Sequence, residues 1–115
     1  MECKVLVQGI TFKENVTDIR NSKAADLVLE MMKCCMQVDV VDPEANPTEV
    51  RQHYGIEMTP STKNDYDAVI VAVSHDAYMN LEETDYNMMM KPDAFMMDIK
   101  GIMKDKITGM DYFSL

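Results

Sequence analysis

The most uniformly apolar stretch of this chain is Ala68-Val69-Ile70-Val71-Ala72-Val73. An unbroken apolar run of this length, rich in β-branched residues, is typical of a strand that is buried on both faces. Such strands occur almost only in parallel sheets that helices cover on both sides. The sequence therefore predicts a central strand at 68–73 in an α/β fold.

Further strand patterns alternate with helical patterns along the chain. Strands are expected at 4–9, 37–42, 94–98 and 112–115, with a brief edge strand at 56–58. Helices are expected after a cap at Asn21 or Ser22, over 47–54, and from about Asp76 after a cap at Ser74, whereas 82–87 reads as irregular. The first helix should bury one stripe, made of Ala24, Leu27, Val28, Met31, Met32 and Cys35. We predict an α/β Rossmann-like three-layer sandwich, with a mostly parallel sheet of five to six strands and helices on both faces.

The composition indicates one folded, acidic domain that spans residues 1–115. A hydrophobic content of 47% in 115 residues suits one core. The net charge of −9 disfavours nucleic acid and anionic membranes, because both attract positive surfaces. No apolar run approaches the ~20 residues of a membrane span, and no signal-peptide core follows the N-terminus. We therefore expect a cytoplasmic protein.

Cysteine and histidine are too sparse to predict a metal centre. Cys3, Cys34 and Cys35 form no Cys-x-x-Cys pair, and His53 and His75 stand alone in the sequence. The thiols are expected to be reduced and structural. None is placed as an accessible, activated nucleophile, so no catalytic residue is predicted.

The loop at 9–22 joins the first expected strand to the first helix and carries two cations, Lys13 and Arg20. In an open α/β sheet this loop lies at the carboxyl edge, where ligands bind. Cations near a helix N-terminus suit an anionic oxygen such as a phosphate. The alternative is that both are solvated loop charges.

Two further residues follow strands and so face the same edge. His75 comes after 68–73 and is a candidate hydrogen-bond donor or base towards a substrate, or else a brace for the loop and helix start. Lys100 comes after 94–98 and either meets a phosphate or carboxylate, or pairs with Asp98. The sequence leaves these alternatives open.

The glycines of a dinucleotide-binding loop are missing. After Gly9 the next glycine is Gly55, so no Gly-x-Gly-x-x-Gly motif can cradle a pyrophosphate. Asp42 ends the second strand, where a ribose-binding acid would sit, but without the glycines a turn role is favoured. A two-component receiver domain is also disfavoured, because 9–11 and 74–76 lack its acidic cluster and phosphate-accepting aspartate.

Several short motifs occur in an order that is similar to a known family. They are Phe12-Lys13, Thr17-Asp18, Arg20, Ser22, Val38-Asp39-Val40-Val41-Asp42-Pro43, Tyr66-Asp67-Ala68, Ala72-Val73-Ser74-His75 and Asp98-Ile99-Lys100-Gly101. Together they resemble the C-terminal UDP-binding domain of the UDP-glucose/GDP-mannose dehydrogenase family over nearly the whole chain. Within the family, the segment 13–22 looks most like members that oxidise UDP-N-acetylhexosamines.

The resemblance implies that this chain is the C-terminal piece of a longer NAD-dependent UDP-sugar 6-dehydrogenase, which makes uronic acids for surface polysaccharide. It implies that Lys13 and, more loosely, Lys100 lie on the substrate side of the cleft, and Arg20 on the cofactor side. The catalytic cysteine and most of the NAD site would belong to a preceding domain, so the chain alone is expected to be inactive. Expected partners are the UDP-sugar, the remaining domains and a second copy in a homodimer.

One position departs from the family pattern, because Lys23 stands where many members carry proline. This leaves the start of the first helix open. The alternative function is a free-standing nucleotide-binding or assembly module without catalysis. A parent reading frame with a glycine fingerprint and a cysteine motif upstream would decide for the enzyme.

Overall fold

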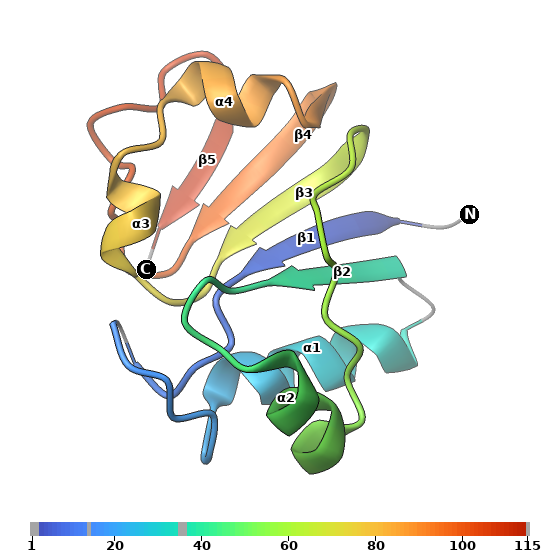
Figure 1. Ribbon diagram of the computed structural model, residues 1–115. Helices are drawn as coiled ribbons and strands as arrows, with labels where there is room; N and C mark the ends of the chain where they lie inside the picture. Colours follow the sequence, from blue (N-terminus) through green and yellow to red (C-terminus); the bar gives the residue numbers. More distant parts are fainter. Residues whose placement is uncertain (1–2, 14, 35–36, 115) are drawn as a thin grey trace.

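A computed structural model of the chain describes residues 3–13, 15–34 and 37–114. These residues form a five-stranded sheet in the order β2-β1-β3-β4-β5, and every neighbouring pair of strands is parallel. The elements are β1 (Lys4–Gln8), α1 (Lys23–Lys33), β2 (Gln37–Val41), α2 (Pro47–Tyr54), β3 (Tyr66–Val71), α3 (Asp76–Met79), α4 (Glu83–Asn87), β4 (Met90–Asp98) and β5 (Asp111–Ser114). The predicted α/β sandwich is confirmed, with β3 at its centre (Figure 1).

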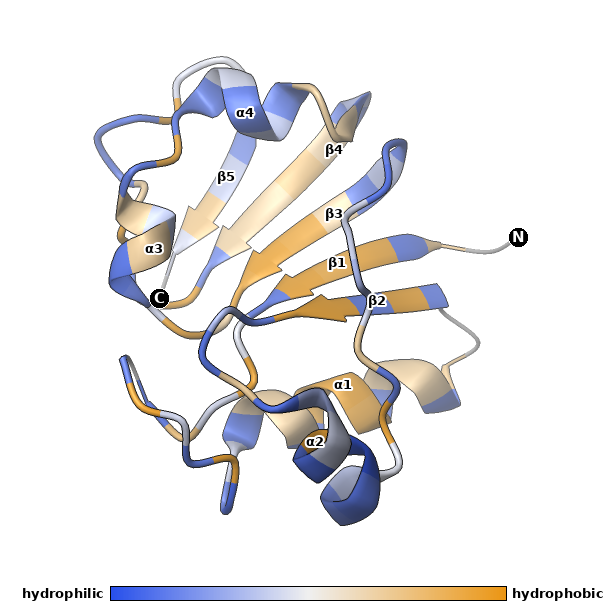
Figure 2. Cartoon of the chain, in the orientation of Figure 1, coloured by the Kyte–Doolittle hydropathy of each residue, from blue (hydrophilic) through white to orange (hydrophobic). Residues whose placement is uncertain are grey.

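The sheet separates two hydrophobic clusters, because alternate residues of each strand point to opposite faces. On β1, Val5 and Val7 join the cluster beneath α1 and α2, while Leu6 joins the cluster beneath α3 and α4. Figure 2 shows the apolar central strands between more polar outer segments. None of the helices in the described ranges is long and apolar enough to cross a membrane.

Local signals fix the boundaries of the two longer helices. The Ser22 hydroxyl accepts a hydrogen bond from the Ala25 amide, so α1 begins at Lys23. Asn46 caps α2 in the same way, with Pro47 in its first turn. Gly55 ends α2 in the left-handed conformation. The predicted bounds of α2 are confirmed, and of the two caps that the sequence left open for α1, Asn21 and Ser22, the structure has Ser22.

Three local predictions were wrong. The segment 56–58 forms no strand, although the Thr59 amide bonds to the Val40 carbonyl at the outer edge of β2. Residues expected to be irregular form α4, where Glu82 and Asp85 make a reciprocal capping box. His75, not Ser74, occupies the N-cap of α3.

The predicted apolar stripe of α1 is confirmed only in part. The buried residues of α1 are Ala24, Ala25 and Val28, and of these Ala24 and Val28 belong to the predicted stripe. The predicted stripe residue Met32 is exposed. The predicted stripe position Cys35 lies outside the described residues.

Gly9 turns the chain out of β1 at the point where β1 and β3 approach most closely. It has a φ of +102°, and a Cβ atom on it would lie 2.8 Å from the Val73 backbone nitrogen. The neighbouring Gln8 carbonyl accepts from the Ala72 amide at 2.9 Å. Only a residue without a side chain fits this crossing.

We predict that Gly9→Ala destabilises the domain far more than Gly55→Ala. Gly55 has a φ of +71° and no atom within 4 Å of an added Cβ, so the substitution costs only the backbone strain of about 1–2 kcal/mol. At Gly9 the clash with Val73 adds about 1–3 kcal/mol. Urea unfolding of both variants measures the difference, and equal midpoints would contradict the close approach.

Candidate functional site

The carboxyl ends of all five parallel strands lie at one edge of the sheet. Between β1 and β3 this edge contains a topological switch point, because α1 follows β1 on one face and α3 follows β3 on the other (Figure 1). Ligands of open α/β sheets bind in the crevice outside such a point. A cavity of about 260 Å³ opens here, between the loop after β1, the start of α1 and the ends of β3 and β4.

The cavity presents two lysines and no carboxylate. It is lined by Thr11, Phe12, Asn21, Lys23, Ala24, Leu27, Ala72, Val73, Ile99 and Lys100. Among the described residues, neither Lys23 nor Lys100 forms an ion pair. In a chain with a net charge of −9, a local positive site of this kind suits an anionic group.

Lys23 is a site residue that the sequence analysis missed. The sequence marks Lys23 only as the residue that stands where many family members carry proline. Sequence spacing does not show which side chains line the same cavity. One feature of the sequence does point to Lys23, which is its place in the first turn of a helix at the ligand edge. The helix dipole does not stabilise a cation at this end, whereas a bound anion would.

Lys100 is held over the cavity by a turn that Asp98 organises. The buried Asp98 carboxylate accepts from the Gly101 amide at 3.0 Å, the Met103 amide at 2.7 Å and the Tyr112 hydroxyl at 2.6 Å. Burial, followed by the hydrogen bond to Asp98, raises the pKa of Tyr112 and keeps its hydroxyl a donor. Because these donors occupy Asp98, the predicted alternative of a Lys100–Asp98 pair is not observed.

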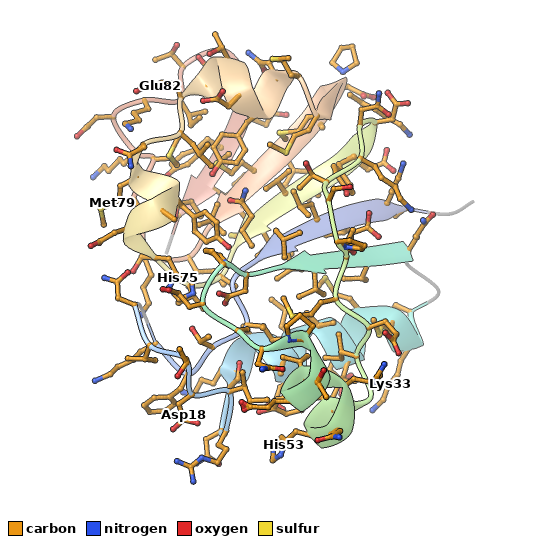
Figure 3. The ribbon with its side chains drawn as sticks, viewed as in Figure 1. Asp18, Lys33, His53, His75, Met79 and Glu82 are labelled. Carbon is orange, nitrogen blue, oxygen red and sulfur yellow. The ribbon has the colours of Figure 1, made fainter. Side chains whose placement is uncertain are left out.

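His75 lies inside the protein rather than on the cavity wall. It is 0% exposed, and both ring nitrogens have protein partners: Nδ1 accepts from the Asn15 amide, and Nε2 lies 2.9 Å from Asp42 Oδ2. Figure 3 shows it between the loop after β1 and α3. This geometry leaves no ring atom for the predicted contact with a substrate and favours the alternative, a histidine that braces the loop.

Asp42 is likewise structural. Its Oδ2 accepts from the amides of Ile10 and Thr11, at 2.7 and 3.2 Å, and its Oδ1 accepts from the Glu44 amide at 2.7 Å. These bonds hold the loop after β1 and the turn after β2. The predicted turn role describes Asp42 better than a ribose-binding role.

Lys13 and Arg20 lie on the loop at different distances from this cavity. Lys13 is exposed and directly follows Phe12, which lines the cavity. Arg20 instead lines a separate polar groove beside α2, with Thr17, Asp18 and Glu49 among its neighbours. Arg20 therefore faces a space other than the switch-point cavity, and the ligand assignments of both cations stay predictions.

Arg20 already has a partner in the absence of any ligand. Its Nε and NH2 atoms donate to the two oxygens of Asp18 at 3.0 and 3.1 Å. These hydrogen bonds lower the pKa of Asp18 to about 2 and raise the pKa of Arg20. Both groups are solvent-exposed, so the pair can open to admit an anion.

The sequence matches one family model over residues 6–105, the UDP binding domain of the UDP-glucose/GDP-mannose dehydrogenase family. A UDP-N-acetyl-D-glucosamine 6-dehydrogenase of Salmonella typhi is 39% identical over 100 residues, which are 86% of this chain and 24% of that protein. The protein of the same name from Pseudomonas aeruginosa is 36% identical over 104 residues, 89% of this chain and 24% of its own length.

Solved structures share the fold. An NDP-N-acetyl-D-galactosaminuronic acid dehydrogenase from Methanosarcina mazei Go1 superposes with a TM-score of 0.80 at 21% identity, over 98% of this chain and 24% of that one. The chain spans about a quarter of the length of the curated relatives it matches. The match over residues 6–105 confirms the resemblance seen in the sequence, and the chain belongs to the UDP-binding domain family of the UDP-glucose/GDP-mannose dehydrogenases.

Proposed function

We propose that this chain is the C-terminal domain of a longer NAD-dependent UDP-sugar 6-dehydrogenase, and that it binds the UDP portion of the nucleotide sugar. The observation that carries the proposal is the carboxylate-free cavity at the switch point, with Lys23 and Lys100 on its wall and Lys13 beside it. The two lysines on the cavity wall suit the two negative charges of a nucleotide-sugar diphosphate. The apolar atoms of Phe12 and Leu27 supply the remaining wall.

In this proposal the substrate is a UDP-N-acetylhexosamine, whose C6 alcohol the parent enzyme oxidises to a carboxylate. Support comes from the names of the Salmonella and Pseudomonas relatives. The same proposal makes the parent a cytoplasmic homodimer that supplies uronic acids for polysaccharide, without nucleic acid or membrane contact. The net charge of −9 supports the last point.

The residues of this domain do not fit NAD on their own. The loop after Gly9 lacks the further glycines that a pyrophosphate cradle needs, and Asp42 is fully engaged by amides and His75. NAD would supply the hydride acceptor and be held chiefly by another domain. The role left to this chain is one contact, from the exposed Arg20.

The proposal predicts that UDP binds this chain and that Lys13→Ala and Lys100→Ala each weaken binding. A charge-assisted contact contributes about 1.5–3 kcal/mol, so each variant should raise the Kd roughly tenfold to a hundredfold. Lys33→Ala is the matched control, because Lys33 lies at the far end of α1, paired with Glu30 (Figure 3). Calorimetric titration with UDP gives the Kd values. A wild-type chain that does not bind UDP, or a control that loses as much affinity, would refute the proposal.

A second prediction concerns Arg20 in the parent enzyme. Arg20→Ala should raise the KM for NAD more than the KM for the UDP-sugar, because Arg20 faces a different space from Lys100. Arg20→Lys should recover only part of the loss, since lysine cannot make a planar bidentate contact. Steady-state kinetics with each substrate varied separates the two effects. A selective loss of UDP-sugar affinity would show the assignment to be wrong.

The isolated domain provides the control for that variant. An exposed ion pair adds little to stability, so Arg20→Ala should hardly change the melting temperature. The same variant should let the pKa of Asp18 rise from about 2 towards its ordinary 3.8, which carbon NMR of the carboxyl group can follow. A large loss of stability would instead make Arg20 a structural brace.

A further inference from the structure

The loop segment that carries Lys13 is tied to one buried side chain on both sides. Two residues before Lys13, the Thr11 hydroxyl lies 3.1 Å from Nε2 of His75. Two residues after it, the Asn15 amide donates to Nδ1 of the same ring at 2.9 Å. Lys13 itself is exposed, so the position of its backbone depends on contacts made by its neighbours.

The hydrogen-bond partners assign the proton of the His75 ring. Nδ1 accepts from an amide N–H, so it carries no proton, and the proton of the neutral ring resides on Nε2. Nε2–H then faces Asp42 Oδ2 at 2.9 Å and Thr11 Oγ1 at 3.1 Å. The Thr11 hydroxyl can accept from it, because its own proton goes to the Lys13 carbonyl at 2.9 Å.

The anchor for this arrangement lies in two other elements. Asp42 follows β2 and is tied to the Ile10, Thr11 and Glu44 amides, so it fixes both the ring and the start of the loop. Asn15, with a φ of +60°, also caps the start of α3 through its side-chain oxygen, 2.9 Å from the Asp76 amide. The ring therefore joins β2, the loop and α3 beneath Lys13.

From these contacts we infer that His75 is a positioning residue for ligand binding, acting through Lys13 and never touching the ligand. This inference rests on the proposed UDP-binding function. Of the two ring nitrogens, the acceptor Nδ1 contributes more to the placement of Lys13, because it accepts the hydrogen bond from the Asn15 amide. Asp42 keeps the Ile10, Thr11 and Glu44 amides as donors when Nε2–H is removed.

Two near-isosteric variants separate the ring nitrogens. In His75→Asn the side-chain oxygen can replace the acceptor Nδ1, and in His75→Gln the side-chain amide can replace the donor Nε2. We expect His75→Gln to speed hydrogen exchange of the Asn15 amide and to raise the Kd for UDP about two- to tenfold. His75→Asn should keep Asn15 protected and stay closer to wild type.

The matched control is Met96→Val, a substitution in the core on the opposite face of the sheet, where Met96 is 0% exposed. It lowers stability without touching the loop, so it should leave the UDP affinity unchanged. If it weakens binding as much as His75→Gln does, the effect of His75 is general destabilisation and the inference is wrong.

A double-mutant cycle with Lys13 gives the decisive test. If His75 acts by placing Lys13, His75→Gln should cost no further affinity in a Lys13→Ala background. Additive losses would overturn the inference. Ring nitrogen shifts in NMR of the ligand-free chain report whether the Nε2–H form is present, and a proton on Nδ1 would also overturn it. A wild-type chain that shows this tautomer and a protected Asn15 amide but no UDP affinity would refute the proposed function, leaving only the loop anchoring supported.

Discussion

The hydrogen bonds that converge on the Asp42 carboxylate hold the ligand edge together. One side chain at the end of β2 receives the amides of Ile10 and Thr11 from the neighbouring loop, the Glu44 amide from its own turn, and Nε2 of His75 from beyond β3. A buried charge without partners costs several kcal/mol. With these donors, Asp42 instead fixes three chain segments, which are the loop after β1, the turn after β2 and the segment at His75.

Asp98 does the same at the end of β4, where it collects the Gly101 and Met103 amides and the Tyr112 hydroxyl. Both carboxylates are buried and satisfied by N–H and O–H groups rather than by lysine or arginine. This explains how an acidic chain presents a positive site. Among the described residues, Lys23 and Lys100 form no ion pair, because hydrogen-bond donors rather than lysines stabilise the buried acids.

The sequence predicted the architecture because the central strands contain short apolar runs and the helices have local end signals, as at 68–73 and at Pro47 and Gly55 around α2. It failed where an element depends on distant partners. The short helix α4 rests on its capping box and on Glu83, whose carboxylate accepts from the amides of Thr108 and Gly109. No pattern within 82–87 shows those partners.

The site shows the same division. Lys100 could be placed at the ligand edge because it follows a strand, a position that topology determines. The burial of His75 and the approach of Lys23 to Lys100 depend on packing between segments more than 50 residues apart in the sequence, which spacing does not encode. The sequence therefore shows which titratable residues follow strands and lie at the ligand edge. It does not show which of them can contact a ligand and which hold the loops in place.

The loop after β1 has one part that is anchored to buried side chains and another part, at Arg20, whose ion pair is exposed to solvent. The amides of Ile10, Thr11 and Asn15 are tied to buried groups, whose hydrogen bonds are costly to leave unmade. Arg20, in contrast, is held by a solvent-exposed pair with Asp18, and such pairs add little to stability. In the proposed function, a phosphate would displace Asp18 from Arg20 at small cost while the Thr11 and Asn15 anchors on either side of Lys13 stay in place. The loop would then bind two ligands without the second disturbing the site of the first.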